Sequence, residues 1–285
     1  MNRLALAFLV LMPALFSCGA EGGMLLWDVA GQEEVTLSGI LPELKQNSIV
    51  YVGEEHDVPE HHAVQLEVIK SLHESGADLA VGLEMFIHRD QNVLNRWVTG
   101  DLDEEGMEGV FMRNWGHMWK LYQDIFMYCR MNGIPMLGLN VPREITRQVA
   151  RQGFESLTEE QVAELPMVTC QVDPEYERFL RRVMGGHNQG ENFQNFCEAQ
   201  LVWDTSMAVY SLEYLKENPE KTMVVILGTV HAWKKAVPRQ VERLSPRKID
   251  QEVMLPDTPG EQEREEVLID DCDYLILGMG VESAE

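Results

Sequence analysis

The sequence predicts an α/β protein with a parallel-sheet core flanked by helices and an inserted helical lobe. Short apolar runs occupy residues 49–52, 79–83, 134–139 and 223–227, and a fifth lies at 274–277. These runs are continuous rather than alternating, which is typical of strands buried on both faces of a parallel sheet. Segments with helical periodicity lie between them, as the crossover connections of such a sheet require.

The first interval between strands has the pattern of a single crossover helix. Within residues 61–76, Val68 and Leu72 recur at helical spacing, and Gly76 offers a C-terminal stop. Residues 49–83 therefore predict one strand–helix–strand unit.

The later intervals are too long for simple crossovers and predict helical insertions at about residues 88–130 and 144–216. Four aromatic residues of the first insertion fall on one predicted helical face, namely Trp115, Trp119, Tyr122 and Phe126. In the second insertion, residues 194–215 predict a long helix that ends before a proline. Residues 245–266 are rich in proline and acidic residues, and they predict a loop outside the core.

The N-terminus has the pattern of an export signal. Arg3 precedes an apolar run over residues 4–16, which is too short for a permanent membrane span. The junction before Cys18 resembles the lipobox of bacterial lipoproteins, so we expect residues 1–17 to be a signal peptide and Cys18 to be lipidated. Ordinary secretion and a retained anchor are the alternatives. Residues 18–285 then form a single α/β domain, anchored on the periplasmic side of the cell envelope.

The charge balance and the cysteines narrow the class of partner and site. The chain has 47 acidic and 23 basic residues, which argues against nucleic acid as a partner because phosphate binding needs clustered cations. Apart from Cys18, the cysteines are scattered without a C-x-x-C pair, at Cys129, Cys170, Cys197 and Cys272. This pattern predicts no zinc knuckle and leaves disulfide pairing open.

Polar side chains follow four of the predicted strands. Glu54 and His56 follow the first, Glu84 the second, Asn140 the third and His231 the fourth. The carboxyl ends of parallel strands meet at one edge of a sheet, where ligands bind. Two copies of G-x-x-H, at residues 53–56 and 228–231, suggest tight turns that bring the two histidines together.

Three interpretations of this set remain open. Glu54, His56, Glu84 and His231 offer ligands for a divalent zinc, manganese or iron ion, and a metal-bound water would make the protein a hydrolase. Alternatively, the same groups bind an organic ligand, or they satisfy one another as a structural network.

The other histidines differ in their surroundings. We expect His61, His62, His73 and His88 to occupy surface or helix-capping positions without a ligand role. His187 lies in a segment flanked by glycines, which favours a loop that projects the side chain, and it is a candidate functional residue.

Several motifs resemble one known family. Residues 52–57, 82–86, 139–143, 199–208 and 228–231 are similar in order and spacing to the motifs of the ChaN family of haem-binding uptake lipoproteins. Gln65 and Gln91 extend this resemblance, which spans about residues 25–244.

The resemblance implies haem binding in iron uptake by a parallel-sheet protein with a helical lobe. It implies a haem site at a homodimer interface, with His187 as the leading haem contact and Tyr122 as a weaker one. An arginine such as Arg143 would bind the haem propionates, and an outer-membrane haem receptor or transporter is an expected partner. The related Tiki and TraB group implies the alternative, a metal-dependent hydrolase of the peptidase type that uses both G-x-x-H motifs and Glu84. The third reading is a lipid-anchored module that binds a partner without a cofactor.

The lipobox generates a direct prediction for Cys18. Replacement of Cys18 by serine removes the thiol that would carry the lipid, so the protein should move from the membrane fraction to the soluble fraction with its signal still cleaved. Fractionation and immunoblotting measure this, with Cys129→Ser as the control. A Cys18→Ser protein that is cleaved and still sediments with membranes would show that lipid is not the anchor.

Overall fold

An eight-stranded sheet organises the chain. The computed structural model describes residues 23–168, 170–183, 193–258, 264 and 267–278, and its strand order is β2-β1-β8-β7-β3-β6-β4-β5. The strands are β1 Leu25–Asp28, β2 Glu33–Thr36, β3 Ile49–Glu54, β4 Leu79–Ile87, β5 Met136–Asn140, β6 Thr222–Gly228, β7 Gln251–Pro256 and β8 Tyr274–Ile276. The six strands from β8 to β5 run parallel, and β1 is antiparallel to both of its neighbours. The predicted fold class is therefore confirmed.

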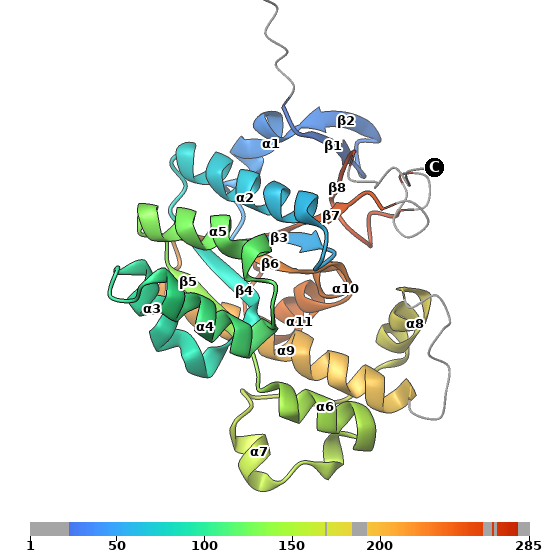
Figure 1. Ribbon diagram of the computed structural model, residues 1–285. Coiled ribbons are helices and arrows are strands. Elements are labelled where there is room, and N and C mark those ends of the chain that lie inside the picture. Colours follow the sequence, from blue (N-terminus) through green and yellow to red (C-terminus); the bar gives the residue numbers. More distant parts are fainter. Residues whose placement is uncertain (1–22, 169, 184–192, 259–263, 265–266, 279–285) are drawn as a thin grey trace, which may run out of the picture.

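Helices cover both faces of the sheet (Figure 1). Those of the first half are α1 Leu37–Leu44, α2 Pro59–Glu74, α3 Gln91–Val98, α4 Glu104–Trp115 and α5 Trp119–Asn132. Those of the second half are α6 Arg143–Gln152, α7 Glu159–Ala163, α8 Pro174–Val183, α9 Phe193–Glu217, α10 Thr229–Ala232 and α11 Val237–Leu244. Helices α3 to α5 fill the first long interval, and α6 to α9 lie in the second, with α6 and α7 beyond α9 as seen from the sheet (Figure 1).

The strand residues alternate between two apolar cores. Val50 and Val52 of β3 join the cluster formed with helices α1 to α5, whereas Ile49 and Tyr51 join the cluster formed with α8, α9, α10 and α11. Each face of a central strand is therefore buried, which explains why the sequence shows continuous apolar runs.

Local signals set several helix boundaries. Helix α2 begins with Pro59. Proline has no backbone N–H, and this costs nothing here because an N–H in the first helical turn has no partner within the helix. Thr158 and Gln161 form a reciprocal capping box at α7. Helix α5 ends at Gly133, which has a φ of 64° in the left-handed region that glycine adopts at least cost.

Two sequence predictions need correction. Strand β7 lies inside residues 245–266, which were predicted to be a loop, and it pairs in parallel with the central strand β3. Its apolar run is short and flanked by acidic residues and Pro256, so only tertiary pairing identifies it as a strand. The predicted aromatic stripe is also split between two helices, because Trp115 ends α4 whereas Trp119, Tyr122 and Phe126 lie on α5.

Within the part of the chain that the structure describes, no helix is both long enough and apolar enough to cross a membrane.

The packing between β4 and β5 predicts a strict requirement for glycine at position 138. A Cβ atom there would lie 2.7 Å from the backbone oxygen of Ile87, so Gly138→Ala should destabilise the protein by about 2–3 kcal/mol through overpacking. Gly109 is the control, because it lies in α4 and an added Cβ would meet nothing closer than 3.9 Å. Gly109→Ala should stabilise by about 0.5–1 kcal/mol. Urea denaturation measures both, and equal stabilities of the two variants would contradict the packing.

Candidate functional site

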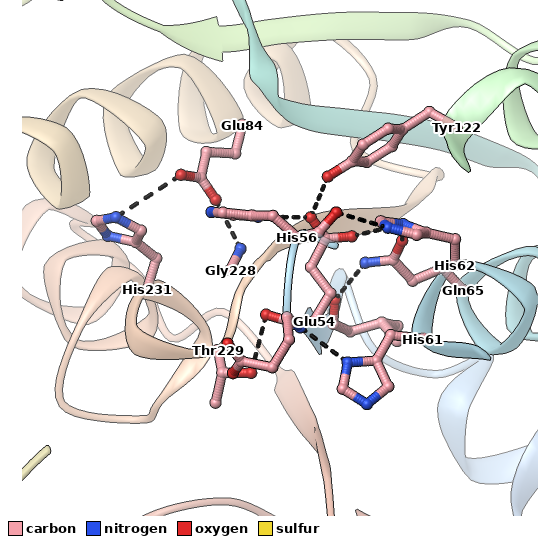
Figure 2. Close-up of polar contacts among 12 residues, drawn as sticks. Glu54, His56, His61, His62, Gln65, Glu84, Tyr122, Gly228, Thr229 and His231 are labelled. Atoms are coloured by element: carbon pink, nitrogen blue, oxygen red, sulfur yellow. Dashed lines mark hydrogen bonds and ion pairs between the residues drawn. The ribbon is translucent and has the colours of Figure 1, made fainter. Parts of the chain in front are cut away.

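The carboxyl edge of the sheet collects the polar residues that the sequence singled out. Glu54 is the last residue of β3, Glu84 lies near the end of β4, and His231 lies in α10 directly after β6. Figure 2 shows Glu54 paired with His56, and Glu84 paired with His231. The structure thus brings the four residues together at this edge, where all of them line one cleft.

The glycines of the two G-x-x-H motifs act by close packing rather than by turning the chain. Gly53 and Gly228 both lie within strands, and Gly228 has a φ of −58°. A Cβ atom on Gly228 would lie 2.8 Å from Cε1 of His56. The absence of a side chain at Gly228 therefore lets the His56 ring lie against β6, which corrects the predicted turns.

Glu54 is the centre of one half of the cluster. Its side chain is fully buried, and its carboxylate lies 2.9 Å from Nδ1 of His56 and 2.9 Å from Nδ1 of His62. The Tyr122 hydroxyl donates a hydrogen bond to the same carboxylate. Burial alone would raise the pKa of Glu54, but hydrogen bonds from the two histidines outweigh it and lower the pKa to about 2.

Asp204 plays the corresponding part in the other half. Its carboxylate lies 2.6 Å from Nδ1 of His231 and accepts a hydrogen bond of 2.5 Å from the Tyr176 hydroxyl. Asp204 lies on α9 and Tyr176 on α8, so the helical lobe supplies this half. Burial opposes a charge on His231, but Glu84 and Asp204 outweigh it and raise the pKa of His231.

Glu84 contacts the second half and acts on the first through its charge, which raises the pKa of His56. Its Oε2 accepts a 2.6 Å hydrogen bond from the backbone N–H of Gly228, and its Oε1 lies 3.7 Å from Nε2 of His231 (Figure 2). Asn140 holds the backbone of Glu84 through a 2.7 Å hydrogen bond to its carbonyl. These residues, which we call the acid–histidine chain, form two groups: Tyr122, Glu54 and His56 in one, and Glu84, His231, Asp204 and Tyr176 in the other.

His56 is the member of this chain that faces the cleft most openly. Its side chain is 38% exposed. Burial lowers the pKa of His56, but the hydrogen bond to Glu54 and the charge of Glu84 outweigh it and raise the pKa to about 9. His56 is therefore an imidazolium at neutral pH in this arrangement.

Sequence reasoning missed several residues of the site and misplaced two histidines. His61 and His62 were assigned to surface or capping positions, but both are buried. His61 accepts a 2.8 Å hydrogen bond from the backbone N–H of Glu55, and His62 pairs with Glu54. His62 and Gln65 are three residues apart and therefore lie on one face of α2, and this spacing was the sequence signal that could have identified them. Asp204 lay within a recognised motif, but nothing in the sequence paired it with His231.

A cleft of about 430 Å³ lies over the acid–histidine chain. Its floor includes His56, Glu84 and His231, and Arg143 lines it from the start of α6. The walls are mainly aromatic and apolar, with Trp115, Met118, Phe196 and Trp203 among the lining residues. Trp115 meets the His56 ring edge-on at 5.0 Å between centroids, and Trp203 meets His231 in the same way at 5.7 Å.

The remaining sequence candidates fall in different places. Tyr122 is fully buried with its hydroxyl on Glu54, so it lies beneath the cleft and supports the floor. Arg143 is exposed at the cleft. His187 and Cys18 lie outside the residues that the structure describes.

The donor atoms are of the kind that bind zinc, manganese or iron, but here they pair with one another. Both histidines direct Nδ1 to a carboxylate, an orientation also found in metal-ligating histidines. Across the described residues, however, no three side chains of His, Cys, Asp or Glu are placed to hold one metal ion. The arrangement observed is two histidines, each held at Nδ1 by a buried carboxylate, with Glu84 nearby.

These features define an α/β protein with a ligand-binding cleft at the carboxyl edge of a parallel sheet, with aromatic walls and an acid–histidine floor. A family model described as haem-binding uptake, Tiki superfamily, ChaN matches residues 40–241. The chain therefore belongs to the ChaN family, and the resemblance predicted from the motifs is confirmed.

Two solved structures are similar to the chain, and the first of them supports the fold. The structure of ChaN from Campylobacter jejuni, solved to show cofacial haem binding, aligns with a TM-score of 0.67 at 18% identity over 90% of this chain and 96% of that one. An erythromycin esterase, EreC, aligns less well, with a TM-score of 0.49 at 15% identity over 83% of this chain and 76% of that one.

A plant relative matches only part of the chain. RETICULATA-RELATED 5, a chloroplastic protein of Arabidopsis thaliana, is 30% identical over 118 residues, which is 39% of this chain and 16% of that protein. The chain thus spans about one sixth of this curated relative.

The pairing of Glu54 with His56 predicts a particular dependence of stability on pH. His56 has a pKa raised from 6.5 to about 9, so its contribution is complete below pH 6.5 and is lost as the pH rises through 9. Glu54 has a pKa lowered from 4.5 to about 2, so its contribution is complete above pH 4.5 and is lost as the pH falls through 2.

Glu54→Gln should therefore reduce the loss of unfolding free energy between pH 6.5 and 9, because the His56 pKa returns toward its ordinary value. Urea denaturation at several pH values measures this slope. Glu105→Gln, an exposed acid on α4, should keep the wild-type slope. Equal slopes for Glu54→Gln and wild type would contradict the pairing.

Proposed function

We propose that the protein is an exported, lipid-anchored haem-binding protein that holds haem in the cleft above the acid–histidine chain and acts in the uptake or handling of haem iron. The observation that carries this proposal is membership of the ChaN family, together with a cleft whose chemistry suits a porphyrin. Fold alone would not suffice, because one fold hosts many functions.

The residues of the cleft fit the requirements of haem. A porphyrin needs apolar contact on its faces and a cation for its propionates. Trp115 and Trp203 are both among the lining residues, and Arg143 lies at the cleft without an ion-pair partner in the described parts of the chain. The family's association with cofacial haem also supports a homodimer in which two such clefts face each other.

The iron ligand is best sought away from the cleft floor. The pKa of His56 is raised to about 9, so iron would have to displace a proton from its ring at neutral pH. The Tyr122 hydroxyl is buried on Glu54. His187 remains the proposed iron contact, on the strength of the family resemblance.

The cellular setting is part of the same proposal. A lipid on Cys18 would hold the protein on the periplasmic side of the envelope, where an outer-membrane haem receptor or transporter could deliver its cargo. A diacylated N-terminus gives durable attachment without a spanning helix.

One observation favours a second candidate function, a hydrolase. His56 and His231 each have Nδ1 held by a buried carboxylate, the arrangement by which enzymes orient a catalytic histidine. The metal-dependent form requires the two Nε2 atoms and Glu84 to converge on an ion. Elemental analysis of the purified protein separates this form from haem binding, because only the metallohydrolase should carry a stoichiometric metal in the absence of haem.

Haem binding is tested by titrating the full chain in mild detergent with hemin. The wild type should show a saturable shift of the Soret band, and His187→Ala should bind at least about 10-fold more weakly with an altered spectrum, because an iron ligand is lost. His73→Ala is the control, since His73 contacts Tyr128 at the far end of α2. Absence of any saturable shift in the wild type would refute haem binding, and an unchanged spectrum and affinity in His187→Ala would refute only the ligand assignment.

A further inference from the structure

Gln200 is a buried polar residue without a partner. It lies on α9 and is 9% exposed, and its Oε1 atom is buried with no hydrogen-bond partner in the described structure. Leaving a buried amide unpaired costs free energy that an apolar residue at the same position would not cost. Such a group calls for an explanation, and a bound ligand is one.

The position of Gln200 indicates where that ligand lies. Phe196, Gln200 and Trp203 all line the cleft, and their spacing places them on one face of α9. The amide therefore sits between two aromatic side chains on the wall of the cleft. An amide can present either its oxygen or its N–H groups after a half-turn of the side chain, so it can donate to an acceptor on the ligand.

The neighbouring wall carries positive charge. Arg143 begins α6 and lines the cleft, and no acidic side chain pairs with its guanidinium among the described residues. This is notable in a chain with a net charge of −24. Helix α6 has ten residues, and its N-cap is Pro142, which provides no side-chain hydrogen bond to the first turn. The acidic residue of the first turn, Glu144, lies 3.8 Å from Arg89, so the partial positive charge of this helix end can still favour an anion beside Arg143.

These observations point to one kind of ligand group. A carboxylate accepts hydrogen bonds from an amide N–H, from a guanidinium and from backbone N–H groups. In the floor of the cleft, in contrast, Glu54 and Glu84 are paired with His56 and His231, so the charges there are compensated within the protein. We propose that Gln200, Arg143 and the N-terminus of α6 form a carboxylate-binding subsite on the α6–α9 side of the cleft.

This inference rests on the proposed function and makes it more specific. If the ligand is haem, its propionate edge lies against α6 and α9. The protein then recognises the propionates as well as the iron. The subsite then binds a dicarboxylate porphyrin with or without iron. It also gives a reason for Gln200 to be present at a cost in stability.

The experiment compares three probes, namely hemin, iron-free protoporphyrin IX and hemin dimethyl ester. They are titrated into the full chain in mild detergent and followed by quenching of tryptophan fluorescence and by absorbance. The variants are Gln200→Met, which keeps the side-chain length, Gln200→Glu, which adds a repelling charge, and Arg143→Gln. Gln194→Met and Arg151→Gln are the controls, because both are exposed residues of the same two helices outside the cleft.

Gln200→Met and Arg143→Gln should weaken hemin and protoporphyrin alike, by about 10-fold each, and Gln200→Glu should weaken them more. The dimethyl ester should bind the wild type more weakly than hemin does and should not respond to these variants. Gln200→Met should also melt at a temperature no lower than that of the wild type, because it removes an unpaired amide.

Each other result has a distinct meaning. Hemin binding that is unchanged in Gln200→Met and Arg143→Gln would overturn the subsite and leave the proposed haem function standing. A dimethyl ester that binds as tightly as hemin would likewise overturn it. A wild type that binds neither hemin nor protoporphyrin would overturn both proposals. Should Gln200→Met melt at a lower temperature, the unpaired amide would be refuted as the basis of the inference, and Arg143→Gln and Gln200→Glu would still test the carboxylate contact.

Discussion

The buried carboxylate of Glu54 is the constraint on which the site depends. An ionised group at the end of a central strand cannot remain buried without partners, and its partners come from separate parts of the chain. His56 follows the same strand, His62 comes from α2, and Tyr122 comes from α5. Pairing with one carboxylate thus fixes the loop after β3 and the start of α2 relative to α5, and this assembly forms the floor of the cleft.

The two halves of the cleft floor are supported by helices on opposite faces of the sheet. Helices on one face of the sheet support His56 through Glu54 and Tyr122, and helices on the other face support His231 through Asp204 and Tyr176. Glu84 contacts Gly228 and His231, and its charge also raises the pKa of His56 in the other half. Because the charged groups of this floor pair with one another, we assign the recognition of anionic ligand groups to the α6–α9 wall, where Arg143 and Gln200 lie.

The sequence predicted the parts of the fold that local patterns encode and missed those that depend on tertiary contacts. Continuous apolar runs identified β3, β4 and β6 because these strands are buried on both faces. Strand β7 escaped notice because its short apolar run lies among acidic residues and becomes a strand only beside β3. The same limit applies to the site. The positions of Glu54, Glu84 and His231 after strands predicted that they lie close together. The pairing of His231 with Asp204 and of His62 with Glu54 could not be predicted, because periodicity does not reveal which separate segments come into contact.

The central claim is that haem lies in the strand-end cleft, and the histidines of the chain can report on it directly. In a protein labelled with ¹³C-histidine, ferric haem broadens the ring signals of nearby residues through its unpaired electrons. Saturating hemin should broaden the signals of His56 and His231, while His73, at the opposite end of the roughly 24 Å long helix α2, should remain sharp. Loss of the His73 signal with sharp His56 and His231 signals would contradict the account, because it would place the haem away from the carboxyl edge of the sheet.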